Sequence, residues 1–142
     1  MTKRTSLRKN ERGAALLETA ITIPIILLIT VGIFEFGRAY QTWQVLTNAA
    51  REGARMAILV DKTDAEVQTV VKNYITSGGL PATPTVNIDR NVAMGTNTAS
   101  RITVDYPFRF IVLNPVVRMV TPSSTTGAPL TMQSTALMRN ES

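Results

Sequence analysis

The chain has 142 residues, which suits one domain, and a net charge of +5 from 15 Lys and Arg against 10 Asp and Glu. It contains no His and no Cys, which excludes zinc sites built on these residues, Ser/His/Asp and Cys/His nucleophile arrangements, thiol redox chemistry and disulfides. No Gly-rich phosphate-binding loop is present, and the acids Asp89, Asp105 and Glu141 stand alone on predicted strands or in the tail. The composition therefore predicts neither an enzyme nor a protein that needs a cofactor or a metal ion.

The first segment, residues 1–12, is strongly basic, with Glu11 as its one acid. Its cations are Lys3, Arg4, Arg8, Lys9 and Arg12. Basic residues beside a first membrane crossing stay in the cytoplasm, so we expect residues 1–13 to be a cytoplasmic leader. Binding to nucleic acid is a weaker interpretation, because no aromatic side chains are interleaved with the cations.

The next segment, residues 13–34, is apolar except for one charged residue, Glu18. At about 1.5 Å per residue it forms a helix about 33 Å long, close to the roughly 30 Å hydrocarbon core of a bilayer. The remaining chain, with short and polar strands, is too small to surround such a helix on all sides. We therefore predict a transmembrane helix over residues 14–36 and an exported α+β domain over residues 37–142.

The residues that follow the apolar core argue against an ordinary secretory signal peptide. Such a peptide has an apolar core of about 7 to 15 residues and ends at a small-x-small cleavage site. Here residues 35–40 are Glu-Phe-Gly-Arg-Ala-Tyr, so we expect the anchor to be retained. A soluble secreted domain is a further alternative, and it requires cleavage between Phe36 and Tyr40.

Gly13 lies between the basic leader and the apolar helix. Cleavage after Gly13 removes only the leader and makes Ala14 the first residue of the mature chain. An ionised carboxylate inside a bilayer costs several kcal/mol, so Glu18 is expected to pair with the terminal ammonium of a neighbouring subunit. The alternative is that Glu18 extends to the lipid headgroups beside Arg12.

Aromatic residues cluster directly after the apolar core. They are Phe34, Phe36, Tyr40 and Trp43. Because aromatic side chains favour the membrane–water interface, we expect these residues at the outer interface. Glu35 and Arg38 among them are expected to mark the emergence of the helix into water.

The helix is predicted to continue beyond the membrane to about Leu59, because apolar and small residues recur at three- and four-residue steps. The predicted stripe consists of Phe36, Tyr40, Trp43, Thr47, Ala50, Ala54 and Ala57. The small residues near its end allow another backbone to approach closely. We expect the domain's own sheet there, with a helix of a second subunit as the alternative.

Thr63 and Glu66 form a predicted capping box at the start of a second helix, which ends at Ser-Gly-Gly over residues 77–79. Its expected apolar stripe is Val67, Val70, Val71, Tyr74 and Ile75. Asp61 and Asp64 at its start fit helix caps better than calcium ligands.

Beyond residue 81 the apolar pattern alternates, which predicts strands near residues 86–88, 102–110 and 130–138. Loops are expected over residues 91–100 and 121–129, which are rich in Gly, Ser, Thr and Asn. The apolar run over residues 108–113 is expected to be a core strand rather than a docking surface, with Arg109 and Arg118 facing solvent. The predicted fold is α+β, with a small, mainly antiparallel three-stranded sheet packed on the exported half of the long helix.

Three motifs in register resemble the TadE-like family. They are Arg-Gly-Ala-Ala-Leu-Leu-Glu at residues 12–18, Gly-Ile-Phe-Glu-Phe-Gly-Arg at residues 32–38, and Leu-Thr-Asn-Ala-Ala-Arg-Glu-Gly-Ala-Arg at residues 46–55. Members of this family are TadE- and TadG-related minor pilins or pseudopilins of the tight-adherence (Tad) pilus machinery, a branch of the type IV pilus superfamily. The resemblance extends over about residues 12–60.

The resemblance implies a pilin-like fold and a single-pass protein of the bacterial cytoplasmic (inner) membrane. The amino terminus would be cytoplasmic, and the exported domain would be periplasmic or extracellular, in a surface pilus. The implied partners are the lipid bilayer, other pilin-like subunits, a prepilin peptidase of the TadV kind and the Tad assembly platform. The resemblance places the processing site at Gly13 and Ala14 and the assembly carboxylate at Glu18. Pilins of this branch usually carry Tyr or Phe after that Glu, whereas this chain has Thr19.

These observations predict a minor pilin or pseudopilin that contributes to the assembly of an adhesive filament. The alternative is a binding module that stays anchored in the membrane, recognises an envelope ligand and never enters a filament. The mass of the chain separates the two, because only a processed pilin loses Met1–Gly13.

Overall fold

The computed structural model describes residues 5–115 and 129–140, and the side chains within these ranges from residue 11 onward. Its elements in chain order are α1 (Thr5–Ala57), α2 (Asp64–Ser77), β1 (Thr85–Met94), β2 (Asn97–Phe108) and β3 (Leu130–Arg139). This arrangement confirms the predicted long helix, second short helix and three-stranded sheet. Arg118, Glu141 and the expected loop over residues 121–129, apart from Pro129, lie outside the described residues.

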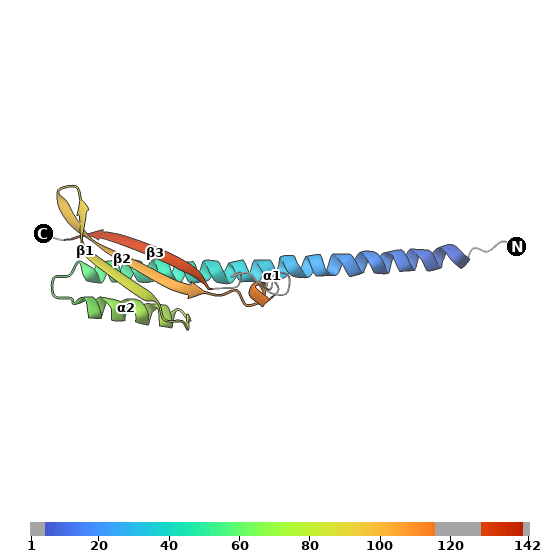
Figure 1. Cartoon of the computed structure of the whole chain (residues 1–142), viewed down its shortest axis with the longest axis horizontal. Coiled ribbons are helices and arrows are strands. Elements are labelled where there is room, and N and C mark those ends of the chain that lie inside the picture. Colours follow the sequence, from blue (N-terminus) through green and yellow to red (C-terminus); the bar gives the residue numbers. More distant parts are fainter. Residues whose placement is uncertain (1–4, 116–128, 141–142) are drawn as a thin grey trace.

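The long helix α1 has two halves with different surroundings (Figure 1). Its first half extends alone from the rest of the molecule, whereas α2 and the sheet lie along its second half. The helix begins at Thr5, within the basic segment and earlier than expected, and ends at Ala57, just before the expected Leu59. The start of α1 and the end of β3 lie at opposite ends of the molecule (Figure 1).

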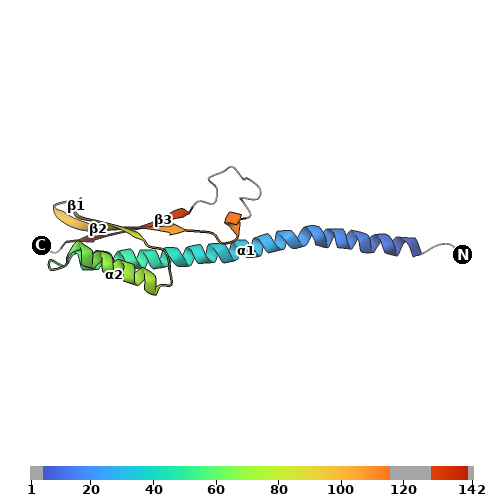
Figure 2. The same ribbon diagram turned by 60° about the horizontal axis from the view of Figure 1, so that its bottom comes forward.

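The second half of α1 and the helix α2 cover one face of the sheet, which gives two layers (Figure 2). The strand order is β1-β2-β3, and both neighbouring pairs are antiparallel. Side chains of the central strand alternate, so that Ile102, Val104 and Tyr106 are buried against the helices. Burial of such side chains stabilises the fold by about 1.5–3 kcal/mol each.

Small residues let the three elements approach closely. Ala49, Ala50 and Gly53 are buried on α1, and a Cβ at Gly53 would lie 2.5 Å from Cγ2 of Val71 in α2 and 3.3 Å from Cγ2 of Ile102 in β2. The expectation that the domain's own sheet packs on this face is therefore confirmed, and α2 packs there too.

The limits of α2 follow from its caps. Thr63 and Glu66 form the predicted capping box, with each side chain accepting a backbone N–H of the other residue. At the carboxyl end, Gly79 has φ +78°, and Leu80 N–H donates to the carbonyl of Ile75 at 3.3 Å, as in a Schellman motif. The expected apolar stripe is buried at Val67, Val71 and Ile75, whereas Tyr74 is exposed.

The expected loop over residues 91–100 is instead most of a β-hairpin. Val92 pairs with Ala99, and Met94 pairs with Asn97 across a two-residue turn. Gly95 has φ +64° in the first turn position, where a type II′ turn requires Gly. A bulge between Asp89 and Val92 shifts the register. The loop prediction was wrong here because pairing with β2 outweighs the low strand propensity of this composition.

Candidate functional site

The first half of α1 is apolar from Gly13 onward, and its side chains from residue 11 to residue 30 are exposed. Its most apolar window has a mean hydropathy of 2.3, and none of that window is buried. By length and composition it is the one helix among the described residues that could cross a membrane. The residues predicted for processing and assembly, Gly13, Ala14 and Glu18, lie on this half and are exposed. Their roles stay predictions.

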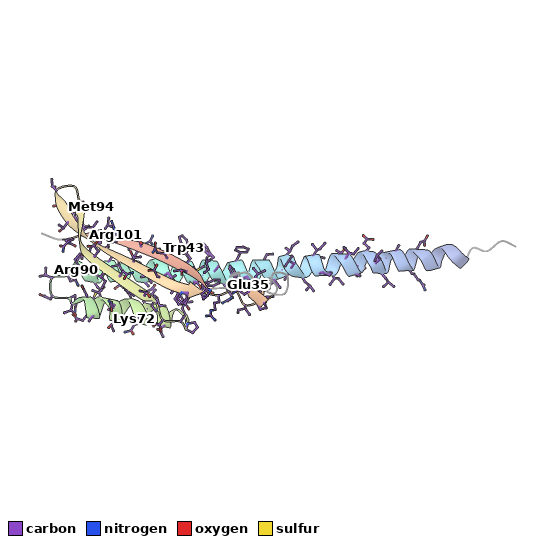
Figure 3. The ribbon with its side chains drawn as sticks, viewed as in Figure 1. Glu35, Trp43, Lys72, Arg90, Met94 and Arg101 are labelled. Atoms are coloured by element: carbon purple, nitrogen blue, oxygen red, sulfur yellow. The ribbon has the colours of Figure 1, made fainter. Side chains whose placement is uncertain are left out.

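Glu35 lies at the junction of the two halves, and its surroundings contradict the expectation that it marks emergence into water. It is only 2% exposed. Its Oε1 accepts the backbone N–H of Ile111 at 2.7 Å and that of Val112 at 2.6 Å, and its Oε2 accepts a hydrogen bond from Nη1 of Arg38 at 2.9 Å. Glu35 is therefore a buried anchor for the segment after β2 (Figure 3).

The segment after β2 returns to α1 instead of continuing as a strand. β2 ends at Phe108, which is buried. Phe110 is half-buried, and its ring packs edge-on against two others. The ring centroids are 5.2 Å apart for Phe108 and 6.3 Å apart for Phe36. The expected core strand over residues 108–113 is correct only for Phe108, because the amides beyond it find the Glu35 carboxylate instead of a neighbouring strand.

The tip of this returning segment is apolar and exposed. Ile111 is 64% exposed and Val112 is 41% exposed. Arg109 faces solvent as expected, while Arg38 lies 5.3 Å above the ring of Phe108. An open groove of about 540 Å³ adjoins the segment, and its lining includes Arg38, Arg109 and Ile111.

The buried face of α1 differs from the predicted stripe in its first turns. Phe36, Tyr40 and Trp43 are exposed, and the buried positions are Glu35, Ala39, Thr42 and Leu46. The smaller residues Ala39 and Thr42 occupy the buried face because the returning chain and the sheet approach the helix closely there. The predicted and observed stripes merge at Ala50, Ala54 and Ala57, which are buried as expected.

The exposed aromatic residues lie beside the junction. Tyr40 and Trp43 have ring centroids 6.1 Å apart, and Nε2 of Gln44 donates to the Tyr40 hydroxyl at 2.6 Å. Phe34 is also exposed. This placement suits an aromatic belt at the outer interface, and that role of Phe34, Phe36, Tyr40 and Trp43 stays a prediction.

Arg90 is a second residue whose role the sequence did not indicate. The bulge of β1 directs its guanidinium to the far end of α1 (Figure 3). Nε donates to Oδ1 of Asp64 at 2.7 Å, Nη1 to the carbonyl of Ala57 at 2.9 Å, and Nη2 to the carbonyl of Lys62 at 2.7 Å. Arg90 thus caps α1 and fastens the start of α2 to it.

The acids of the sheet are less isolated than expected. Oδ1 of Asp105 accepts a hydrogen bond from Nε2 of Gln133 at 2.8 Å, and Oδ2 accepts one from Nδ2 of Asn87 at 3.5 Å. Oδ1 of Asp89 accepts the backbone N–H of Asn91 at 3.1 Å. These contacts join neighbouring strands and the bulge, which is a structural role.

A comparison with protein families matches part of the long helix. Residues 13–55 match the model of the TadE-like protein family. The TadE-like segment lies entirely within α1 and includes Gly13, Glu18 and Glu35, and the match confirms the resemblance seen in the sequence. No curated protein and no solved structure matches the chain. The TadE-like segment and the exposed apolar helix together fit a membrane protein related to the Tad pilus.

Proposed function

We propose that the chain is a TadE-like minor pilin or pseudopilin that contributes to the assembly of a Tad-type adhesive pilus. The observation that carries the proposal is the contrast within α1, whose second half is packed against a sheet while its apolar first half is bare. A bare apolar helix needs lipid or other apolar helices around it. A membrane supplies the lipid, and a filament supplies the other apolar helices.

In this proposal, residues 1–13 form a cytoplasmic leader, residues 14–36 span the inner membrane, and residues 37–142 form the exported domain. The basic leader supports this orientation. The chain would then work with the lipid bilayer, other pilin-like subunits, a prepilin peptidase and the Tad assembly platform. The polar outer face of the sheet, which includes Arg101 and Thr135, would face the aqueous space.

The proposed processing step is cleavage between Gly13 and Ala14. Both residues are exposed, and a Cβ at Gly13 would have no neighbour within 4 Å. Among the described residues, Glu35 is the first residue of α1 that is buried. Removal of the leader would therefore leave the packed half of the molecule intact.

The proposed assembly step is a pairing between Glu18 of one subunit and the new ammonium of Ala14 on a neighbour. The Glu18 side chain is exposed on the apolar helix, so a neighbouring helix can reach it. Each charge alone is costly in an apolar environment, and pairing neutralises both. This gives lateral association a specific register that apolar contact alone does not provide.

The mass of the chain, isolated from cells that carry a Tad pilus system, tests the proposal. We expect a mature chain that begins at Ala14, and a Gly13→Leu variant that keeps its leader. A full-length wild-type chain in cells with an active prepilin peptidase contradicts processing and favours the permanently anchored binding module.

A second experiment tests the assembly role. Glu18→Gln should reduce crosslinking between subunits and the number of surface filaments, whereas Glu11→Gln, which changes an acid of the leader, should leave both unchanged. Unaltered subunit association in Glu18→Gln would remove the role proposed for that carboxylate.

A further inference from the structure

We propose that the returning segment, residues 109–113, makes a second contact with the outer leaflet of the bilayer that α1 crosses, with Ile111 and Val112 inserted among the lipids. This inference rests on the proposed function only through the membrane-spanning position of residues 14–36. It assigns a lipid-binding role to a part of the chain that lies outside the TadE-like segment.

The position of the segment along α1 is the first argument. Glu35 directly follows the apolar run that ends at Phe34. Its carboxylate is 2.7 Å from the backbone nitrogen of Ile111 and 2.6 Å from that of Val112. The segment therefore lies at the level where the helix leaves the apolar run, which is the level of the lipid headgroups if residues 14–36 span the bilayer.

The segment is held firmly at this level. Hydrogen bonds that involve a charged group are stronger than those between neutral groups, and Glu35 accepts two from this backbone and one from Arg38. Phe110 adds edge contacts with the rings of Phe36 and Phe108. Separation of the segment from α1 would leave the buried carboxylate of Glu35 without its two amide donors, so the segment stays in place.

The backbone amides of Ile111 and Val112 donate to Glu35, whereas the apolar side chains of these two residues stay open to solvent. Ile111 is 64% exposed and Val112 is 41% exposed. Phe34 and Phe36, which flank Glu35 in α1, are also exposed. Exposed apolar side chains that are held together in this way are typical of surfaces that meet a membrane or a partner.

The charges around the segment favour lipid. Arg109 is exposed, and the side chain of Arg38 is 43% exposed despite its ion pair with Glu35. Both line the open groove of about 540 Å³ that Ile111 also lines. Cations beside an apolar tip suit a surface with phosphate headgroups above hydrocarbon, whereas they would repel the same cations of a second copy.

Fluorescence quenching by brominated lipids tests this contact. Because the chain has no Cys, a single Cys can carry a bimane label in the full-length chain, reconstituted into vesicles of zwitterionic and anionic lipid. Ile111→Cys tests the segment, and Ile26→Cys reports on the span. Met94→Cys is the matched control, because Met94 is also apolar and exposed but lies at the opposite end of the sheet (Figure 3).

We expect quenching at positions 26 and 111 and none at position 94. Quenching at 26 without quenching at 111 would overturn this inference and leave the span in place. Loss of quenching at both positions would overturn the span and this inference together. A third outcome is that position 111 is shielded from aqueous iodide but is not quenched by lipid. If that shielding disappears when the protein is diluted in lipid, a second copy is the occupant, and the inference is overturned.

Discussion

The carboxylate of Glu35 accepts the backbone N–H of Val112 at 2.6 Å, across 77 residues of chain. This contact joins the end of the apolar half of α1 to the segment that follows β2. Because Glu35 is buried and also bonds Arg38, the end of the proposed membrane span and the near end of the sheet form one unit. In the proposed topology the exported domain therefore begins at the membrane surface, without a flexible stalk.

Removal of this anchor should destabilise the exported domain. Glu35→Ala leaves the amides of Ile111 and Val112 without their acceptor, so we expect a loss of about 2–3 kcal/mol in the free energy of unfolding. Glu35→Gln should lose less, because its amide oxygen still accepts while its NH₂ group faces Arg38. Urea titration in mild detergent measures this loss. Glu52→Ala on α1 is the control, and an equal effect there would contradict the assignment.

Gly53 and Gly37 make a matched pair on α1. Gly53→Ala places a Cβ 2.5 Å from a methyl group of Val71 and 3.3 Å from one of Ile102, and overpacking of this kind costs about 1–3 kcal/mol. Gly37→Ala meets nothing within 4 Å, so its higher helix propensity should stabilise the helix by up to about 1 kcal/mol. Thermal unfolding should therefore shift in opposite directions. A stabilising Gly53→Ala would show that α2 and β2 do not pack as described.

Arg90→Lys should weaken the far end of the domain although the charge is kept. A single ammonium cannot replace a guanidinium that bonds Asp64 and the carbonyls of Ala57 and Lys62 together. We expect a loss of about 1–3 kcal/mol in unfolding free energy and faster hydrogen exchange at the end of α1. Arg101→Lys on the exposed face of β2 serves as the control and should change little. Equal behaviour of the two variants would argue against the capping role.

The capping box should make the stability of α2 depend on pH. The backbone N–H of Thr63, and then the Lys62 ammonium, lower the pKa of Glu66 from 4.5 to about 2. A lowered folded-state pKa stabilises the fold above the unfolded value of 4.5, and this contribution is lost as the pH falls through about 2. Urea titrations of wild type and Glu66→Gln should therefore differ at neutral pH and converge toward about pH 2. A difference that stays constant over this range would contradict the shift.

The sequence predicts the elements whose signals are local. The apolar run gives the first half of α1, and the three- and four-residue spacing extends it almost to the observed end at Ala57. Thr63 and Glu66 define the start of α2 because a capping box needs only residues three apart. Alternation places the three strands, and the small residues around Gly53 indicate where the sheet packs.

The features that the sequence did not predict depend on distant partners. Because Glu35 follows an apolar run, the sequence suggests that its side chain is exposed to solvent. Only the amides of Ile111 and Val112 make its burial favourable. One signal was available, because Glu35 lies at helical spacing from Ala39, Thr42 and Leu46, which are buried. The hairpin at Gly95 was missed although its turn is local, because its composition is typical of a loop and its strands are defined by pairing with each other and by the pairing of β2 with β3.

Cysteine labelling from one side of the membrane tests the proposed orientation of the chain. Lys9→Cys and Met94→Cys, each in a chain that otherwise has no Cys, can be labelled with a membrane-impermeant maleimide in spheroplasts that lack a prepilin peptidase. We expect position 94 to be labelled in intact spheroplasts and position 9 to be labelled only after the membrane is permeabilised. Labelling of position 9 in intact spheroplasts, or protection of position 94, would contradict this orientation.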